Sequence, residues 1–449
     1  MTTKLQTYPK YKDSGVEWLG RIPAGWEVKK LKFVASVQAS NVDKKSYEGE
    51  KNVLLCNYVD VYKNESVDST LPFMNATATN KQVIELGLQV NDVLITKDSE
   101  TPDDIGIPAL VEETVKDLVC GYHLYLLRLL GESATGEYLF RFLQSHPVKG
   151  YFETHSNGVT RFGLGSYSVK NIFIYIPPSH EQKQIADFLD GKTKVIDELI
   201  EKKEKLIALL REKRTALITR AVTKGLDPRA KRKPSGVEWL GRIPAGWEKL
   251  PLKFLFSYQS GGVWGDDERQ DEHDIICIRV ADFDFLRFIA HSSDYTLRNL
   301  PKIKEELVLS GASILLEKSG GGDQSPVGRA VRYLEKQRAT CSNFVQKLQT
   351  NKKYNSDFIV LLFSALYSMG VTKKAIKQTT GIQNLDLGYF MRTDIFLPSS
   401  EEQKNIVDYI NDKVGSIVGT TEKVEAQIEK LKEYRSSLIY SAVTGEIKI

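Results

Sequence analysis

The sequence predicts an α+β protein built as an internal repeat, in which two globular heads of mixed α/β structure are combined with two long, paired helices. The first observation is a block of fourteen letters, SGVEWLGRIPAGWE, which occurs at 14–27 and again at 235–248. The second is that each block precedes a region of strand-like runs and loops, and the third is that each region leads into a long helical pattern. A repeat of this size has to be recognised first, since it decides how the chain is divided.

The displacement from Ser14 to Ser235, which we call the repeat offset, relates features along the whole chain. It pairs Cys56 with Cys277 and Cys120 with Cys341. It also relates the Glu-Gln-Lys triplets at 181–183 and 402–404. The stretches between these anchors differ strongly. A constant frame that carries two different heads accounts for both facts.

The repeat divides the chain into six segments. In the first half we expect a lead segment (1–27), a head (28–176) and a spacer helix (177–225). In the second half we expect a linker with the second fourteen-letter block (226–248), a head (249–397) and a spacer helix (398–449). Each fourteen-letter block is called a lead block below. A length of 449 residues suits several domains with cores of their own. The Gly, Pro and Trp residues of each lead block predict a structured turn that packs a head onto the helices.

Each head is expected to mix short strands with helices and polar loops. Apolar runs at 53–56, 93–95, 275–278 and 314–316 predict buried strands. Glycine-containing loops follow the second run of each head and precede its closing proline. Arg, Lys, Asn and Gln side chains on such loops can hydrogen-bond base edges, and glycine lets the backbone approach phosphate. On composition alone, ordinary surface loops are the more common interpretation.

The two helical segments each carry a single apolar stripe. Ser179 can cap the first helix, with Gln182 three residues later as in a capping box. Apolar residues recur at steps of three, four and seven, which predicts about 40 residues, or roughly 60 Å, of helix in each copy. One stripe on so long a helix needs a partner, and the other helix is the obvious candidate. The alternative is two amphipathic helices that each lie on their own head. For a coiled coil, the expected interface residues are Leu199, Leu206, Leu210, Leu217, Val424, Ile428, Leu431 and Leu438.

Composition narrows the class of protein. Hydrophobic content of 41% and charged content of 27% are typical of a soluble globular chain. No apolar run is long enough for a membrane helix, and the first residues lack the apolar core of a signal peptide. The four cysteines show no C-x-x-C spacing, which predicts neither a disulfide framework nor a zinc site. We therefore expect a cytoplasmic protein whose cysteines are small core residues.

Charge is distributed unevenly. Residues 28–176 carry 15 Lys and Arg against 18 Asp and Glu, whereas residues 249–397 carry 20 against 17 and residues 177–233 carry 15 against 9. Nucleic-acid binders usually show a basic footprint. Charge alone therefore does not nominate the first head as a nucleic-acid binder.

The sequence contains no recognisable enzymatic motif. The Gly-Lys-Thr at 191–193 lacks the earlier glycine of a phosphate loop, since position 186 is Ala, and it lies in a helical pattern. No G-x-G-x-x-G follows a strand, no Asn-Pro-Pro-Tyr or Asp-Pro-Pro-Tyr occurs, and the six histidines form no H-x-x-x-H pair. We expect no catalytic residue, metal site or cofactor in this chain.

The duplicated order of motifs resembles the DNA specificity subunit (S subunit) of Type I restriction–modification systems. Each half has an I-P-x-x-W block, a central strand followed by Lys, a glycine-containing loop before the closing strand, and an E-Q-K start to a long helix. The resemblance implies that the heads are target recognition domains, each reading one half of a split DNA site, and that the helices pair antiparallel. It also implies assembly with two modification subunits that methylate adenine and with restriction subunits that translocate and cleave DNA. S-adenosylmethionine, ATP and Mg would then bind only to those partners, and no membrane would be involved.

The candidate DNA contacts follow partly from this resemblance. Lys97 and Lys318 match the Lys after the central strand, whereas the loop at 158–164 has Arg161 and Gly163 where the family usually has Gln and Asn. The loop at 379–385 keeps Gln383 and Asn384, one residue later than expected. The complete set of DNA-binding candidates is Lys97, Ser99, Thr160, Arg161, Lys318, Ser319, Gln324, Ser325, Arg329, Gln378, Gln383 and Asn384.

One rival from another class stays open. A non-enzymatic coiled-coil scaffold with two protein-binding heads would explain the repeat and the acidic first head. It would not explain why the frame is kept while both heads differ so freely. Adjacent genes for an adenine methyltransferase and a helicase-nuclease would discriminate between the two hypotheses.

Overall fold

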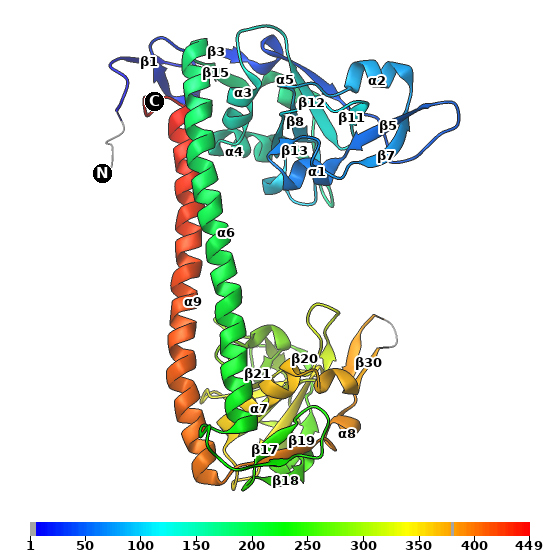
Figure 1. The fold of residues 1–449 in the computed structure, drawn as a ribbon, viewed down its shortest axis with the longest axis vertical. Coiled ribbons are helices and arrows are strands. Elements are labelled where there is room, and N and C mark those ends of the chain that lie inside the picture. Colours follow the sequence, from blue (N-terminus) through cyan, green and yellow to red (C-terminus); the bar gives the residue numbers. More distant parts are fainter. Residues whose placement is uncertain (1–5, 379–380) are drawn as a thin grey trace. The chain divides into compact units, whose positions relative to one another are not determined.

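The computed structural model describes residues 6–378 and 381–449, which form two compact units. The first unit runs to Lys202 and includes Gln427–Ile449, and the second unit is Lys203–Ala426. Each unit holds one head and part of both long helices (Figure 1). Thr379 and Thr380 of the second predicted loop lie outside the described residues. Among the described residues, no helix combines the length and apolar character that crossing a membrane requires.

The first head is centred on a five-stranded sheet in the order β4-β12-β8-β10-β6. These strands are Ala35–Ala39, Leu124–Leu129, Val93–Thr96, Pro108–Val111 and Ser66–Val67. Neighbouring strands are antiparallel, except that β10 and β6 are parallel. All four residues of β8 are buried, as its uninterrupted apolar run predicts. The strand that precedes Lys97 is thus part of the core.

Further elements surround this sheet. A second sheet, β11-β5-β7, consists of Leu118–Cys120, Lys51–Cys56 and Met74–Ala78. The head's helices are α1 to α5, at Tyr58–Lys63, Asn80–Leu86, Gly136–Leu143, His146–His155 and Ser166–Asn171. The chain enters and leaves the head through the antiparallel pair β3 and β15, Glu27–Lys30 and Phe173–Ile176. The lead segment adds the pair β1 and β2, Tyr11–Asp13 and Arg21–Pro23.

The second head repeats this plan with a larger central sheet, in the order β19-β29-β25-β27-β23-β22. These strands are Phe256–Gly261, Val345–Thr350, Ser313–Glu317, Ala330–Arg332, Ile289–Ala290 and Phe283–Asp284. The sheet β20-β24-β21-β28 consists of Asp266–Asp267, Leu297–Asn299, Asp274–Ile278 and Ala339–Cys341. One remaining pair is β16 (Arg232–Pro234) with β17 (Arg242–Pro244). The other is β18 (Glu248–Pro251) with β32 (Asp394–Leu397). The helices of this head are α7, Ser356–Ser368, and α8, Leu387–Phe390.

Single 3-10 turns connect several of these elements. They lie at Glu17–Leu19, Leu31–Phe33, Pro102–Asp104, Leu252–Leu255, Val280–Asp282, Glu305–Leu307 and Thr372–Ala375.

The four cysteines are core residues, as their repeat spacing predicts. β5 and β11 run parallel and place Cys56 opposite Cys120. The corresponding strands β21 and β28 also run parallel in the second head. All four side chains are buried, and burial raises the pKa of each thiol. They therefore stay protonated at neutral pH.

The long helices are α6, Ser179–Lys224, and α9, Ser400–Val443. In the first unit they run in opposite directions. Asp197, in the middle of α6, lies 2.9 Å (Oδ1) from Nε of Arg435 on α9. Glu181, at the start of α6, binds Trp26, which lies beside Gly445 just after the end of α9. In the second unit the end of α6 packs with the start of α9, where Arg211 pairs with Glu425 at 3.3 Å. The prediction of two paired helices is confirmed.

A regular heptad series of buried or half-buried positions runs along each helix, and we call this series the seam. On α6 the seam comprises 193, 196, 200, 203, 207, 210, 214, 217 and 221, and on α9 it comprises 414, 417, 421, 424, 428, 431, 435, 438 and 442. Alternating steps of three and four keep one seam facing a partner helix. Each seam position of α6 has its counterpart on α9 at the repeat offset.

Two of the predicted interface residues lie beside this seam. Leu199 and Leu206 are 41% and 42% exposed, so their assignment to the interface is wrong. The seam passes through Ile200 and Ile207, one residue further along, and each step of one residue turns a helix by about 100°. Of the other predicted residues, Val424, Ile428 and Leu438 are buried, and Leu210, Leu217 and Leu431 are half-buried.

The lead blocks and the E-Q-K triplets repeat because they bind one another. Trp26 is fully buried and its Nε1 donates to Glu181 Oε2 at 2.9 Å, while Trp247 Nε1 donates to Glu402 Oε1 at 3.2 Å. Gln182 does not complete the expected capping box. Its buried amide accepts from the Thr135 backbone N–H at 2.9 Å and thereby holds α6 to the head. The repeated motif is thus a joint between head and helix.

We expect the Trp26 joint to be a large stabilising contribution in the first unit. Trp26→Ala should lower the free energy of unfolding by about 3–5 kcal/mol, because it leaves a cavity and removes one of the two hydrogen bonds to Glu181, the other being donated by Tyr8. Trp18, which is 38% exposed and stacks on Tyr151, provides the control, with an expected loss of about 1 kcal/mol for Trp18→Ala. Denaturant unfolding of both variants checks the difference, and equal losses would contradict it.

Candidate nucleic-acid interface

A small three-stranded sheet in the first head joins two loops that the sequence nominated separately. In sheet order its strands are β13, β14 and β9, which are Ser156–Gly158, Phe162–Leu164 and Asp98–Ser99. The register places Phe162 opposite Ser99. Lys97 and Ser99 are thereby brought close to Thr160 and Arg161, the residues that precede β14.

The hairpin between β13 and β14 presents its tip to solvent. Val159, Thr160 and Arg161 are all exposed. Gly158 is required at the base of this tip, because a Cβ there would lie 2.0 Å from the carbonyl oxygen of Arg161. The tip therefore offers one hydroxyl and one guanidinium to a ligand.

The Arg161 side chain is oriented by half-buried polar groups. Its Nε donates to Asp98 Oδ1 at 3.0 Å, and the other oxygen of Asp98 lies 2.8 Å from His123 Nδ1. The Asp98 side chain is only 14% exposed, whereas that of Arg161 is 57% exposed. A guanidinium carries five donors. Arg161 is thus held in place while part of its donor set still faces solvent.

The second head builds an equivalent sheet. In sheet order its strands are β26, β31 and β30, which are Ser319–Gly320, Gln383–Leu385 and Ile376–Gln378. The register places Ser319 opposite Asn384, and the two side chains are hydrogen-bonded. Gln378 and Asn384 are exposed. Ser319 and Asn384 therefore lie together on one face of this sheet, whereas Gln378 pairs with Gln383 and shares the opposite face with it.

Several candidates have structural roles instead. Gln383 is 5% exposed, and its amide oxygen accepts from the Val327 backbone N–H at 3.3 Å. Arg329 binds the buried Glu317 at 3.0 Å and stacks on Phe285. Because these two side chains are already committed within the head, they are poorly placed to read bases.

The remaining candidates divide in the same way. Lys97 donates to the Tyr122 carbonyl at 2.8 Å, and burial lowers its pKa, while Ser99 is 7% exposed. Lys318 is half-buried. Gln324 and Ser325 are exposed on the loop between β26 and β27. As DNA contacts, the whole set stays a prediction.

Each head has a hollow at the same place beside its small sheet. The hollow of the first head has a volume of about 750 Å³ and that of the second head about 470 Å³. The repeat offset relates Tyr58 of the first to Arg279 of the second, and Asp98 of the first to Ser319 of the second. The position of the hollow is therefore a property of the repeated fold, while its lining differs between the heads.

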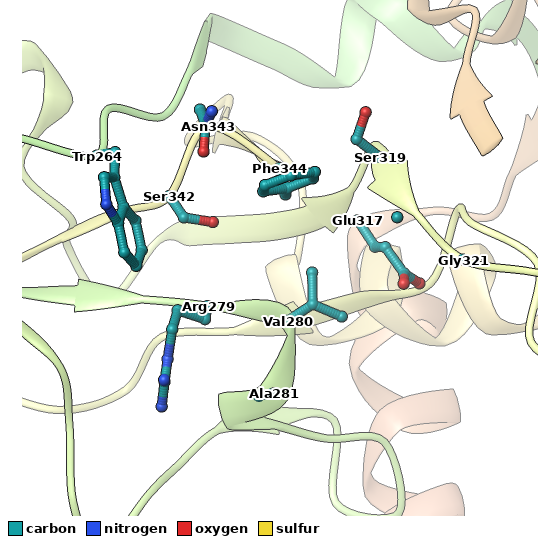
Figure 2. A pocket seen from close by; sticks show the side chains of 11 residues that line it. Trp264, Arg279, Val280, Ala281, Glu317, Ser319, Gly321, Ser342, Asn343 and Phe344 are labelled. Atoms are coloured by element: carbon teal, nitrogen blue, oxygen red, sulfur yellow. The ribbon is translucent and has the colours of Figure 1, made fainter. Parts of the chain in front are cut away.

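The linings differ in chemical character. The first hollow has carboxylates together with Tyr58 and Tyr62, whose rings stack at 5.4 Å. The lining of the second is mostly apolar and includes Trp264, Val280 and Phe344 (Figure 2). The Arg298 guanidinium lies 4.6 Å from the Trp264 ring and supports it from outside the hollow. Trp264 and Phe344 are 39% and 44% exposed.

None of these aromatic residues is among the DNA-binding candidates that the sequence predicts. The sequence does set Trp264 apart, because it is the one tryptophan of five that lies outside the repeated blocks. Large aromatic faces can stack on bases, and the amide and guanidinium groups of the small sheets can bind base edges. Within the residues that the structure describes, no group of three or more His, Cys, Asp or Glu is placed to hold a metal ion.

A comparison with protein families matches the chain twice to the Type I restriction modification DNA specificity domain, at residues 23–209 and 244–430. The chain belongs to this family. The two matches are related by the repeat offset, so each copy of this DNA specificity domain comprises a head and the first part of its following helix.

Relatives and solved structures agree with this assignment. The chain is 23% identical over its full length to the whole of a putative type I restriction enzyme MjaX specificity subunit of Methanocaldococcus jannaschii. It is 22% identical to the MjaVIII specificity subunit of the same organism, over 96% of this chain and 94% of that one. A chain from a structural study of complex assembly and conformational transition of the type I R-M system aligns with a TM-score of 0.67 and 14% identity, over 95% of this chain and 99% of its own. That likeness shows a common fold.

Proposed function

We propose that this chain is the sequence-specific DNA-recognition subunit of a Type I restriction–modification complex, with one half-site of a bipartite target read by each head. The observation that carries the proposal is the repeated small sheet, which has the same location in both heads but different exposed side chains. A location shared by the two heads suits a common docking geometry on DNA, and different side chains suit different base sequences.

The partners of this proposal supply the chemistry. Two modification subunits would bind S-adenosylmethionine and methylate adenine at N6, and restriction subunits would use ATP and Mg to translocate and cleave DNA. The chain itself would hold no cofactor and catalyse no step. The target adenine would be extruded into the partner's pocket, since a base must leave the stack for such chemistry. Shared phosphate contacts with the partners would offset the acidic first head.

Single-molecule sequencing of DNA from cells with and without the gene tests the proposal. The expected result is N6-methyladenine in a split motif, two short halves around a fixed gap, only when the gene is present. If no such motif depends on the gene while a modification subunit is expressed, the coiled-coil scaffold with protein-binding heads becomes the better hypothesis.

Neighbouring residues of β31 offer a matched test of base reading. Asn384→Ala should lower the rate of methylation at the motif by about 10–100-fold, because a good side-chain contact to a base contributes about 1–3 kcal/mol. Gln383→Ala should instead lower the free energy of unfolding by about 1–3 kcal/mol, because it unpairs the buried Val327 N–H. Methylation kinetics and thermal unfolding of both variants would reveal the contrast. Similar profiles for the two would contradict the assignment.

A further inference from the structure

Two arginines occupy equivalent positions in the helix seams. Arg214 of α6 and Arg435 of α9 are related by the repeat offset, and each sits at a heptad position whose neighbours along the seam are mostly apolar. Moving a charged side chain out of water costs several kcal/mol unless partners compensate it. An arginine at the same seam position of both copies therefore indicates a role that an apolar residue would not fulfil.

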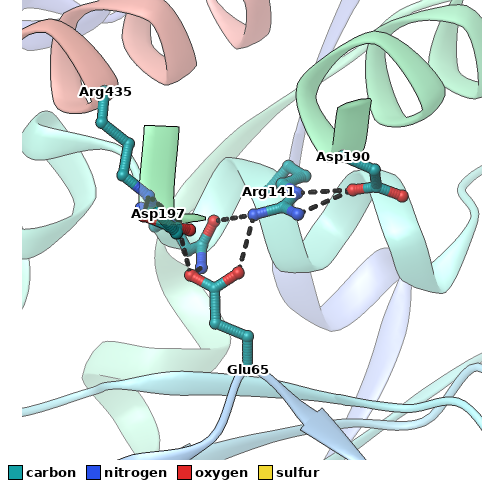
Figure 3. Close-up of polar contacts among 6 residues, drawn as sticks. Glu65, Arg141, Asp190, Asp197 and Arg435 are labelled. Carbon is teal, nitrogen blue, oxygen red and sulfur yellow. Dashed lines mark hydrogen bonds and ion pairs between the residues drawn. The ribbon is translucent and has the colours of Figure 1, made fainter. Parts of the chain in front are cut away.

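Arg435 connects α9 to the first head and to α6. Its Nη2 is paired with Glu65, in the loop after α1, and its Nε donates to Asp197 of α6 at 2.9 Å (Figure 3). Glu65 also lies 3.1 Å from Arg141 of α3, which pairs with Asp190 of α6 at 2.7 Å. Burial would raise the Glu65 pKa, but the charges of Arg435 and Arg141 outweigh it and hold this pKa below its usual value. Head and helices are thus joined by one ionic network.

Arg214 connects α6 to the second head without any carboxylate. Its Nη2 donates to the backbone carbonyls of Leu286 at 2.6 Å and Phe285 at 3.1 Å, and its guanidinium lies 4.2 Å from the Phe288 ring. The residue is 9% exposed, and burial lowers its pKa to about 10. Its Nε has no hydrogen-bond partner among the described residues.

Both arginines reach the same point of the head fold. Phe288, whose ring lies against the Arg214 guanidinium, is the structural counterpart of Glu65. The Glu65 carbonyl accepts from the Leu110 backbone N–H, and the Phe288 carbonyl accepts from the Arg332 N–H. Leu110 and Arg332 in turn pair with Val93 and Ile314, which are related by the repeat offset. Two chemically different contacts have therefore been placed at one structural position. The position, rather than a particular bond, is what the two copies share.

We propose that Arg435 and Arg214 are positioning residues that fix the orientation of each head on the helices and thereby set how strictly the assembled complex selects the number of bases between half-sites. This inference rests on the proposed function. A head that can tilt on its helices would reach half-sites over a range of separations. A head held at one orientation would accept a single spacing.

The two contacts should respond differently to salt. The carboxylates around Arg435 are half-exposed, at 42% for Glu65, 49% for Asp197 and 54% for Asp190, so mobile ions can screen them. Arg214 is buried against carbonyl groups, where screening is weaker. Added salt should therefore loosen the first head more than the second.

The test uses the assembled complex and a set of DNA duplexes that differ only in the number of bases between fixed half-sites. Relative to the preferred spacing, Arg435→Leu should raise methylation at spacings one base longer or shorter by about tenfold, and Arg214→Leu should do the same. Lys432→Ala and Arg211→Ala are the controls, because Lys432 pairs within α9 and Arg211 pairs with α9 rather than with a head. Higher salt should widen the range of spacings that the wild-type complex methylates, toward the range of the Arg435→Leu variant. The range of the Arg435→Leu variant itself should not change with salt.

The outcomes separate this inference from the proposed function. Unchanged spacing selectivity in both leucine variants, with the motif still methylated, overturns the inference alone. Absence of any gene-dependent motif for the wild type overturns the proposed function. If Arg435→Leu fails to fold, Glu65→Gln decides, since it keeps the shape of the side chain and removes the charge; it should broaden the spacing by a comparable factor, and unchanged selectivity overturns the inference for the first head.

Discussion

A chain with two copies of the first head should direct methylation to a symmetric motif. Replacing residues 249–397 by a second copy of residues 28–176 leaves the chain length at 449, since the two segments are related by the repeat offset. The strands of a DNA duplex are related by twofold symmetry, and a reader with matching symmetry recognises a palindrome. One half of the natural motif should disappear, and the reverse complement of the other half should take its place.

The structure indicates where the transplanted head would be held. Trp247 and Glu402 would provide the joint that Trp26 and Glu181 provide for the first copy. The transplanted counterpart of Glu65 would meet Arg214, which occupies the position of Arg435. The counterpart of Arg141 would face Asn411 where the native head faces Asp190, so Asn411→Asp is a natural companion change.

Methylation sequencing in cells measures the result. The complementary chain, with two copies of the second head, should give the palindrome of the other half-site and serves as the control for grafting. If either chain methylated the original asymmetric motif, the assignment of one half-site to each head would be wrong. If both were folded and assembled but gave no motif, the heads would not act as independent readers.

The frame could be predicted from sequence because its determinants are local and repeated. The lead blocks, the E-Q-K triplets and the apolar stripes each recur at one offset, and the structure shows that the blocks and triplets bind one another. The interface residues were harder to assign. Leu199 and Ile200 are both apolar, and only the heptad register of the packed helices shows that Ile200 belongs to the seam.

The candidate site was predictable only in part, because strand pairing joins residues that are far apart in the chain. Asp98 pairs with Gly163, and Ser319 pairs with Asn384, and no local pattern in the sequence fixes either register. The same limit explains why Gln383 was nominated together with Asn384. Successive residues of a strand face opposite sides of the sheet, so of two adjacent polar residues one can be buried and the other exposed. The Gln383 side chain points into the head, and the Asn384 side chain points out of it.

The helices predict a second large effect, on the gap between the half-sites. Inserting seven residues into both α6 and α9, after Lys202 and after Ala426, adds one heptad to each seam and keeps its alternation of three and four. Seven helical residues extend a helix by about 10 Å, which corresponds to about three base pairs at roughly 3.4 Å each. The gap of the methylated motif should therefore lengthen by about three bases, while both half-sites stay the same.

Inserting four residues instead of seven provides the sharpest control. Four residues also lengthen the helices, but they displace the following seam positions, because two turns of a coiled coil need seven residues. Ile207 and Ile428, now 8% and 6% exposed, would be turned relative to the preceding seam residues, so this variant should lose stability and methylate poorly. A seven-residue variant that folds and methylates the original gap would show that the helices do not set the spacing. Loss of activity in the four-residue variant alone, with a longer gap in the seven-residue variant, would show that spacing depends on helix length only while the seam stays in register.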